Sequence, residues 1–170
     1  NKIDNYTLND GLQNDEFSDG AFFKDHRDFL YFGGVSGFSY FNPRNIHLRE
    51  FNPPLILSSL KIYNTVQDIN ERIRKVLKLS YEERFMTFNF IAKDFINNEN
   101  CEYAYRLKNH SDDWVEMGNN PNIIFTQLPP GEYQLEVKST NGDKVWGDNI
   151  YRLTIKVGYP WWLSVPALII

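Results

Sequence analysis

Apolar and polar side chains alternate with a period of two in segment after segment between residues 55 and 157. Within residues 131–140, for example, Tyr133, Leu135 and Val137 fall on one side, with glutamate, glutamine and lysine side chains on the other. Such alternation is typical of a β-strand with one buried and one solvated face. It predicts strands at 55–63, 75–81, 85–93, 101–108, 113–117, 122–125, 131–140 and 151–157.

This many short strands, with no helical period between them, predict an all-β fold: a β-sandwich of the immunoglobulin or fibronectin type. The charged stretch 68–74 could hold a short helix, but its charges are more simply explained by a solvated loop. The turn Leu128-Pro129-Pro130-Gly131 just before Tyr133 favours a tyrosine corner, in which the phenol hydrogen-bonds to upstream backbone. The residues expected in the core or at this corner are Tyr103, Tyr105, Trp114, Tyr133 and Trp146.

Residues 1–52 have a different pattern. Three short aromatic runs, at 21–24, 29–32 and 38–41, are separated by DHRD at 25–28 and by a glycine-rich turn at 33–37. They predict an antiparallel meander, which cannot bury much surface alone because three short strands leave open edges. This segment is therefore expected to be the last piece of a larger repeated β-structure, such as a propeller blade, rather than a free domain. The pair Pro53-Pro54 marks the boundary to the sandwich, which is expected to span residues 53–158.

Residues 159–170, YPWWLSVPALII, are almost entirely apolar after their start. Gly158, Tyr159 and Pro160 end the last strand, and Trp161 and Trp162 then suit the aromatic belt at a membrane surface. We expect Pro160, Trp161 and Trp162 to form a membrane-interface relay, and Leu163 to begin a transmembrane helix. The alternative is a tail that packs on its own domain.

The charge and the single cysteine exclude several functions. A net charge of -4 and a pI near 5.4, with no run of lysine or arginine, argue against a nucleic-acid partner. One cysteine, Cys101, excludes an internal disulfide and a cysteine-based zinc site, and its place in an inward-facing pattern predicts an inert buried thiol.

The sequence contains no convincing catalytic or cofactor motif. His26, His47 and His110 are far apart, and DHRD around His26 is best interpreted as a charged turn. The glycines at 33–37 lack the following lysine and helix that a phosphate site needs, and no nucleophile elbow is present. We therefore expect no catalytic residue, no metal and no cofactor, and by elimination a binding or signal-relaying module.

The order of the motifs resembles the sensor regions of hybrid two-component systems, in which β-propellers are followed by a sandwich called the Y_Y_Y domain. The first block is similar to a closing propeller blade at Tyr6, Asp10-Gly11-Leu12-Gln13, Glu16-Phe17, Gly20-Ala21, Phe32-Gly33-Gly34, Gly37-Phe38 and Phe41-Asn42-Pro43. The second is similar to Y_Y_Y at Tyr103-Ala104-Tyr105-Arg106-Leu107, Trp114, Leu128-Pro129-Pro130-Gly131-Glu132-Tyr133 and Pro160-Trp161-Trp162.

The resemblance implies the membrane-proximal part of a periplasmic sensor at the bacterial inner membrane, without enzymatic activity of its own. An oligosaccharide would bind the full-length sensor, the sandwiches would pair in a homodimer, and a transmembrane helix would pass the change to a cytoplasmic histidine kinase. Because only the last blade is present, no ligand-binding residue is assigned. The alternatives are a fibronectin-like accessory module of a secreted glycan-active enzyme, and the sensor region of a transmembrane transcription factor.

Overall fold

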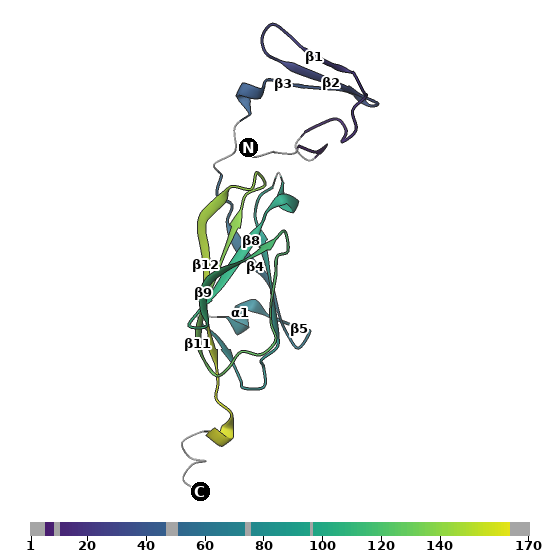
Figure 1. The fold of residues 1–170 in the computed structure, drawn as a ribbon. Helices are drawn as coiled ribbons and strands as arrows, with labels where there is room; N and C mark the ends of the chain where they lie inside the picture. The colour runs from purple at the N-terminus through teal and green to yellow at the C-terminus, as the bar shows by residue number, and fades with distance from the viewer. Residues whose placement is uncertain (1–5, 9–10, 47–50, 74–75, 96, 164–170) are drawn as a thin grey trace. The chain divides into compact units, whose positions relative to one another are not determined.

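The computed structural model describes residues 6–8, 11–46, 51–73, 76–95 and 97–163 (Figure 1). The chain divides into two compact units, Asn1–Arg49 and Glu50–Ile170, and the division falls just before the Pro53-Pro54 pair. Most of the segment in which a transmembrane helix is expected, 164–170, lies outside the described residues, as does His47. No helix among the described residues is long and apolar enough to cross a membrane.

The first unit contains an antiparallel sheet in the order β1-β2-β3. Its strands are β1 (Phe22–Lys24), β2 (Leu30–Gly34) and β3 (Gly37–Phe41), followed by the 3-10 turn η2 (Pro43–Asn45). DHRD forms the turn between β1 and β2, as predicted. The Asp25 carboxylate accepts hydrogen bonds from the backbone N–H groups of Arg27 (2.8 Å) and Phe29 (2.9 Å), which closes the turn.

Aromatic rings occupy both faces of this sheet. Tyr31 stacks on Tyr40 at a centroid distance of 5.7 Å, and Phe32 stacks on Phe41 at 5.9 Å. Because Tyr31 and Phe32 are consecutive on β2, the two stacks point to opposite sides. Several rings remain more than half exposed: Phe22, Phe23, Phe38 and Tyr40.

The second unit is a β-sandwich of two sheets (Figure 1). The four-stranded sheet has the order β10-β7-β4-β5, with β4 (Leu55–Ile62), β5 (Thr65–Gln67), β7 (Met86–Ala92) and β10 (Asn122–Phe125). The five-stranded sheet has the order β6-β12-β11-β8-β9, with β6 (Val76–Leu79), β8 (Tyr103–Lys108), β9 (Ser111–Gly118), β11 (Gly131–Thr140) and β12 (Trp146–Val157). All neighbours run antiparallel except β6 and β12, which are parallel.

The core lies between the two sheets and follows the alternation of the sequence. On β7, Met86, Phe88, Phe90 and Ala92 are fully buried, and the residues between them are partly exposed. Rings from opposite sheets meet edge to face: Phe90 of β7 with Tyr151 of β12 at 5.2 Å, and Phe125 of β10 with Tyr105 of β8 at 5.9 Å. The period-two pattern therefore identifies the buried face of this strand correctly.

Three local predictions differ from the structure. The stretch 68–74 contains a short helix, α1 (Ile69–Arg72), because the Asp68 side chain caps the backbone N–H groups of Asn70 and Glu71. Strand β5 was not predicted, since it is short and pairs only with β4. Strand β12 begins at Trp146 rather than at residue 151, because its pairing with β11 extends to Thr140↔Trp146 across a register shift.

Candidate functional site

No group of three or more His, Cys, Asp or Glu side chains in the described part of the chain is placed to hold a metal ion. His26 and His110 are both exposed, and Cys101 is buried. The sandwich has three other distinct features: the outer face of the five-stranded sheet, the linker at 51–53, and the segment after β12.

The tyrosines proposed for the core have distinct roles. Tyr103 is buried, and its hydroxyl accepts a hydrogen bond from the Ala92 N–H (3.2 Å), which joins the two sheets. Burial raises the pKa of the Tyr103 phenol. Tyr105 is partly buried and packs on the core from β8. Tyr133 is buried, and its hydroxyl donates to the Pro129 carbonyl at 3.0 Å, which is the tie that a tyrosine corner makes.

Trp114 and Trp146 do not fill the core, contrary to the sequence-based expectation. Both lie on the outer face of the five-stranded sheet, and Trp146 is 38% exposed. The Lys138 ammonium lies between them, 4.5 Å from the Trp114 ring and 4.6 Å from the Trp146 ring, and the Arg106 guanidinium lies 4.7 Å from the Trp114 ring. Contacts between cations and ring faces stabilise this exposed surface.

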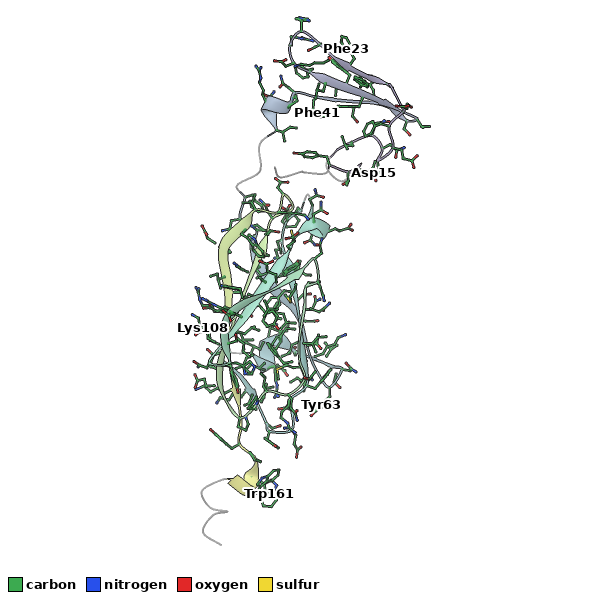
Figure 2. The ribbon with its side chains drawn as sticks, viewed as in Figure 1. Asp15, Phe23, Phe41, Tyr63, Lys108 and Trp161 are labelled. Atoms are coloured by element: carbon green, nitrogen blue, oxygen red, sulfur yellow. The ribbon has the colours of Figure 1, made fainter. Side chains whose placement is uncertain are left out.

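On the same face lies an ionic cluster centred on Glu136, whose side chain is 2% exposed. Its carboxylate contacts the Arg106 Nη2 at 2.7 Å, the Lys108 Nζ at 3.2 Å and the Arg152 Nε at 3.1 Å (Lys108 is labelled in Figure 2). Burial alone would raise the pKa of Glu136, but the charged hydrogen bonds from the three cations outweigh it and hold that pKa below its usual value. The sequence placed Glu136 on the outer face, but its partners come from β8 and β12, and only the register brings them together.

The linker between the units is fixed to the beginning of β12. Asn149 Nδ2 donates to the carbonyls of Asn52 (3.2 Å) and Pro53 (3.4 Å), and Asn141 Nδ2 donates to the Phe51 carbonyl (3.1 Å). A Cβ on Gly147 would stand 2.0 Å from the Asn52 Oδ1, so any larger residue there would require the Asn52 side chain to move. The backbone at 51–53 is therefore held by the hairpin of β11 and β12.

At the other end of β12 the chain continues through Pro160 into the 3-10 turn η4 (Trp161–Leu163). Pro160 is buried, whereas Trp161 and Trp162 are 76% and 51% exposed. The Trp162 ring meets the Tyr81 ring edge to face at 5.5 Å, and the Arg84 guanidinium lies 4.3 Å from the centre of that same tyrosine ring. Sequence reasoning missed Tyr81 and Arg84, because no local pattern links the loop after β6 to the end of the chain.

Comparison with known proteins extends this description. Residues 94–158 match the Y_Y_Y domain family. Histidine kinase P4 from Formosa agariphila is 32% identical over 169 residues, an alignment that covers 94% of this chain and 12% of that protein. The chain therefore spans only a small part of its curated relative.

Two solved structures from B. thetaiotaomicron have a similar fold. One is the extracellular domain of BT3049, described as a hybrid two-component system, with a TM-score of 0.74 and 24% identity over 91% of this chain and 22% of that one. The other is the extracellular domain of BT4673, with a TM-score of 0.59 and 24% identity over 84% of this chain and 20% of that one. At this identity they show the fold alone.

The second unit is thus a β-sandwich of a four-stranded and a five-stranded sheet. Residues 94–158 of it match the Y_Y_Y domain family, which confirms the part of the resemblance that concerns the sandwich. The matched segment contains β8 to β12, but the fold needs the preceding strands as well. Strand β6 completes the sheet beside β12, and β4 and β7 provide the opposite wall of the core.

Proposed function

We propose that this chain is the membrane-proximal periplasmic part of a sensor histidine kinase that relays oligosaccharide binding across the inner membrane. The observation that carries the proposal is the 32% identity to a histidine kinase across both units of the chain. The solved structures with the same fold, titled as extracellular domains of signalling systems, support placement outside the cell membrane. Kinase activity would then lie in another part of the full-length protein.

In this proposal the first unit is the last blade of a β-propeller. Its sheet carries exposed aromatic rings, and the stacks lie on both faces. A three-stranded sheet of this kind gains stability only when further structure covers it, because three short strands bury little and leave these aromatic rings in contact with water. Neighbouring blades would provide that cover, and most of the ligand surface would lie on them.

The signal would leave through the end of β12. Residues 163–170, LSVPALII, would begin a transmembrane helix, with Trp161 and Trp162 in the headgroup layer as the membrane-interface relay. The sandwiches would pair in a homodimer. For ligand binding to act on the kinase, the ligand must have different affinities for two arrangements of that dimer, because only differential affinity shifts such an equilibrium.

The test uses the full-length protein reconstituted in liposomes. Autophosphorylation is measured with and without oligosaccharides released from a panel of polysaccharides, while donor and acceptor dyes at Glu116→Cys report the distance between the sandwiches; Cys101 is buried and should not label. We expect one oligosaccharide class to change both signals together. A monomeric protein, or a kinase indifferent to every ligand that it binds, would contradict the proposal.

A second candidate is a sensor that acts directly on transcription. The extracellular domain of BT4673 is also described as belonging to a one-component system, in which no separate kinase step is needed. The two candidates differ in the sequence beyond Ile170: kinase motifs support the first, and a DNA-binding domain after the membrane span supports the second.

A further inference from the structure

Three chain segments meet at the end of the sandwich from which the polypeptide leaves. They are the β4–β5 hairpin, the β6–β7 loop and the turn η4. Figure 2 shows Tyr63, at the tip of the hairpin, near the end of the sandwich that leads to Trp161. We name this surface the aromatic end and define it by Tyr63, Tyr81, Arg84, Phe85, Trp161 and Trp162.

The aromatic end consists of two groups of contacts, which the β6–β7 loop joins. The Tyr63 ring stacks on Phe85 at 6.3 Å, and the Tyr63 hydroxyl donates to the Glu82 carbonyl. In the same loop, two residues after Glu82, the Arg84 guanidinium lies over the Tyr81 ring. The Tyr81 ring meets Trp162, and Trp162 in turn meets Trp161 at 5.7 Å. The tryptophans are therefore supported by the folded domain rather than carried on an isolated tail.

Its chemistry is that of a protein surface in a phospholipid headgroup layer. Amphipathic rings with polar tips, Tyr63, Trp161 and Trp162, are each more than half exposed, and an arginine lies among them. Tyrosine and tryptophan favour the membrane interface, and arginine binds phosphate. Nearby Glu83 contacts Arg72 and accepts from the Ser80 N–H, so its charge is balanced within the loop; Glu82 is exposed.

The backbone at the hairpin tip places Tyr63 in a tight turn. Tyr63 and Asn64 have φ angles of +47° and +63°, the left-handed conformation of a tight β-hairpin turn. Asparagine and glycine are favoured at such positions, whereas a bulky aromatic residue is strained there. The stack on Phe85 and the hydrogen bond to the Glu82 carbonyl hold the Tyr63 ring at this position, and the residue is still 58% exposed, so that one side of the ring can enter a lipid interface.

We propose that the folded sandwich itself, through the aromatic end, binds the headgroup layer of a phospholipid bilayer, with Tyr63 and Arg84 as contacts beside the tryptophans. The proposal rests on the proposed function, since it requires the domain to lie next to a membrane. It goes further in that the domain would be held at a fixed orientation to the bilayer by three segments.

The experiment measures binding of the 170-residue chain to vesicles of three parts phosphatidylcholine to one part phosphatidylglycerol, by flotation. Arg84→Gln removes the charge and keeps much of the stem. Tyr63→Asn removes the ring, with its Phe85 stack and Glu82 hydrogen bond, but suits the left-handed backbone, and far-UV circular dichroism checks that both variants fold. We expect Arg84→Gln to weaken binding about five-fold, the effect of losing one basic residue at an anionic surface. Tyr63→Asn should weaken it several-fold.

The matched control is Arg27→Gln in the first unit, where the guanidinium also lies over an aromatic ring, that of Phe29 at 5.7 Å. It makes the same change in net charge and should alter binding less than two-fold. If Arg84→Gln and Tyr63→Asn bind like the unmodified chain, only the C-terminal segment contacts lipid and the proposal is wrong. It is equally wrong if the chain ignores vesicles and instead forms dimers that these variants break. The liposome kinase assay is independent: a kinase without ligand response would refute the proposed function, whatever the vesicles show.

Discussion

Replacing Glu136 with glutamine should destabilise the sandwich far more than the same change at Glu132. Both residues lie on β11 and point to the outer face of the sheet. The Glu136 carboxylate is almost fully buried beneath Arg106, Lys108 and Arg152. Glu132, in contrast, pairs with Lys156 at 2.7 Å while both side chains remain about half exposed.

The magnitude follows from what each substitution leaves behind. Removing one partner of a buried ion pair typically costs ~3–5 kcal/mol. In Glu136→Gln the cost should be smaller, about 2 kcal/mol, because the three cationic side chains are 25–56% exposed and can regain water, and because the glutamine oxygen still accepts a hydrogen bond. An exposed pair is worth roughly 0–1 kcal/mol, which sets the expectation for Glu132→Gln.

Urea unfolding of the 170-residue chain, followed by far-UV circular dichroism, measures both free energies of unfolding. Thermal melting gives a second estimate, in which Glu136→Gln should lower the midpoint by about 8 °C. The two variants have the same net charge, so a general effect of charge cancels between them. If both lose less than about 1 kcal/mol and are indistinguishable, the Glu136 cluster does not contribute as its burial implies.

Three further outcomes are expected. Because the folded-state pKa of Glu136 is lowered, its stabilising contribution is complete above the unfolded pKa of about 4.3 and is lost as the pH falls through the folded pKa. The difference in unfolding free energy between the unmodified chain and Glu136→Gln, measured by urea unfolding at pH 7, 4 and 3, should therefore shrink as the pH falls. A difference that stays constant with pH would contradict this expectation. Tyr133→Phe should cost about 1–2 kcal/mol of unfolding free energy, because it removes the hydroxyl and leaves the Pro129 carbonyl without its donor. An unchanged denaturation midpoint would show that this hydrogen bond contributes nothing. Gly147→Ala should loosen the linker, because the added Cβ displaces the Asn52 side chain. Limited proteolysis should then cut between the units faster than in the unmodified chain. Equal cleavage rates would mean that the linker accommodates the methyl group.

Much of the sandwich could be predicted because its strands are long enough to show their period. On β11 the inward set of Tyr133, Leu135 and Val137 is buried, as the alternation predicts. The turn at residues 128–131 also carried its own information, since two prolines and a glycine restrict the backbone just before Tyr133. These are local signals, and they specified local structure.

The tryptophans show where such reasoning fails. Trp114 and Trp146 were expected inside because large aromatic residues are usually buried. They lie outside because Lys138 separates the two rings and shares their surface, an arrangement that needs β9, β11 and β12 in register. The Glu136 cluster and the aromatic end could not be predicted for the same reason: their members come from segments far apart in the chain, and no window of the sequence contains them together.

These features also give the proposed relay a physical basis. Near the beginning of strand β12, Asn149 holds the linker carbonyls, and just after the strand ends the Gly158 N–H donates to the Leu79 carbonyl at 2.9 Å. Between these points it pairs with β11, and from Thr154 to Val157 it also pairs with β6 on its other edge; packed strands of this kind resist deformation. In the proposed sensor, a displacement of the linker would therefore move the whole strand rather than bend it. The aromatic end follows β12 directly, so the displacement would reach the membrane surface without being absorbed by deformation of the sandwich.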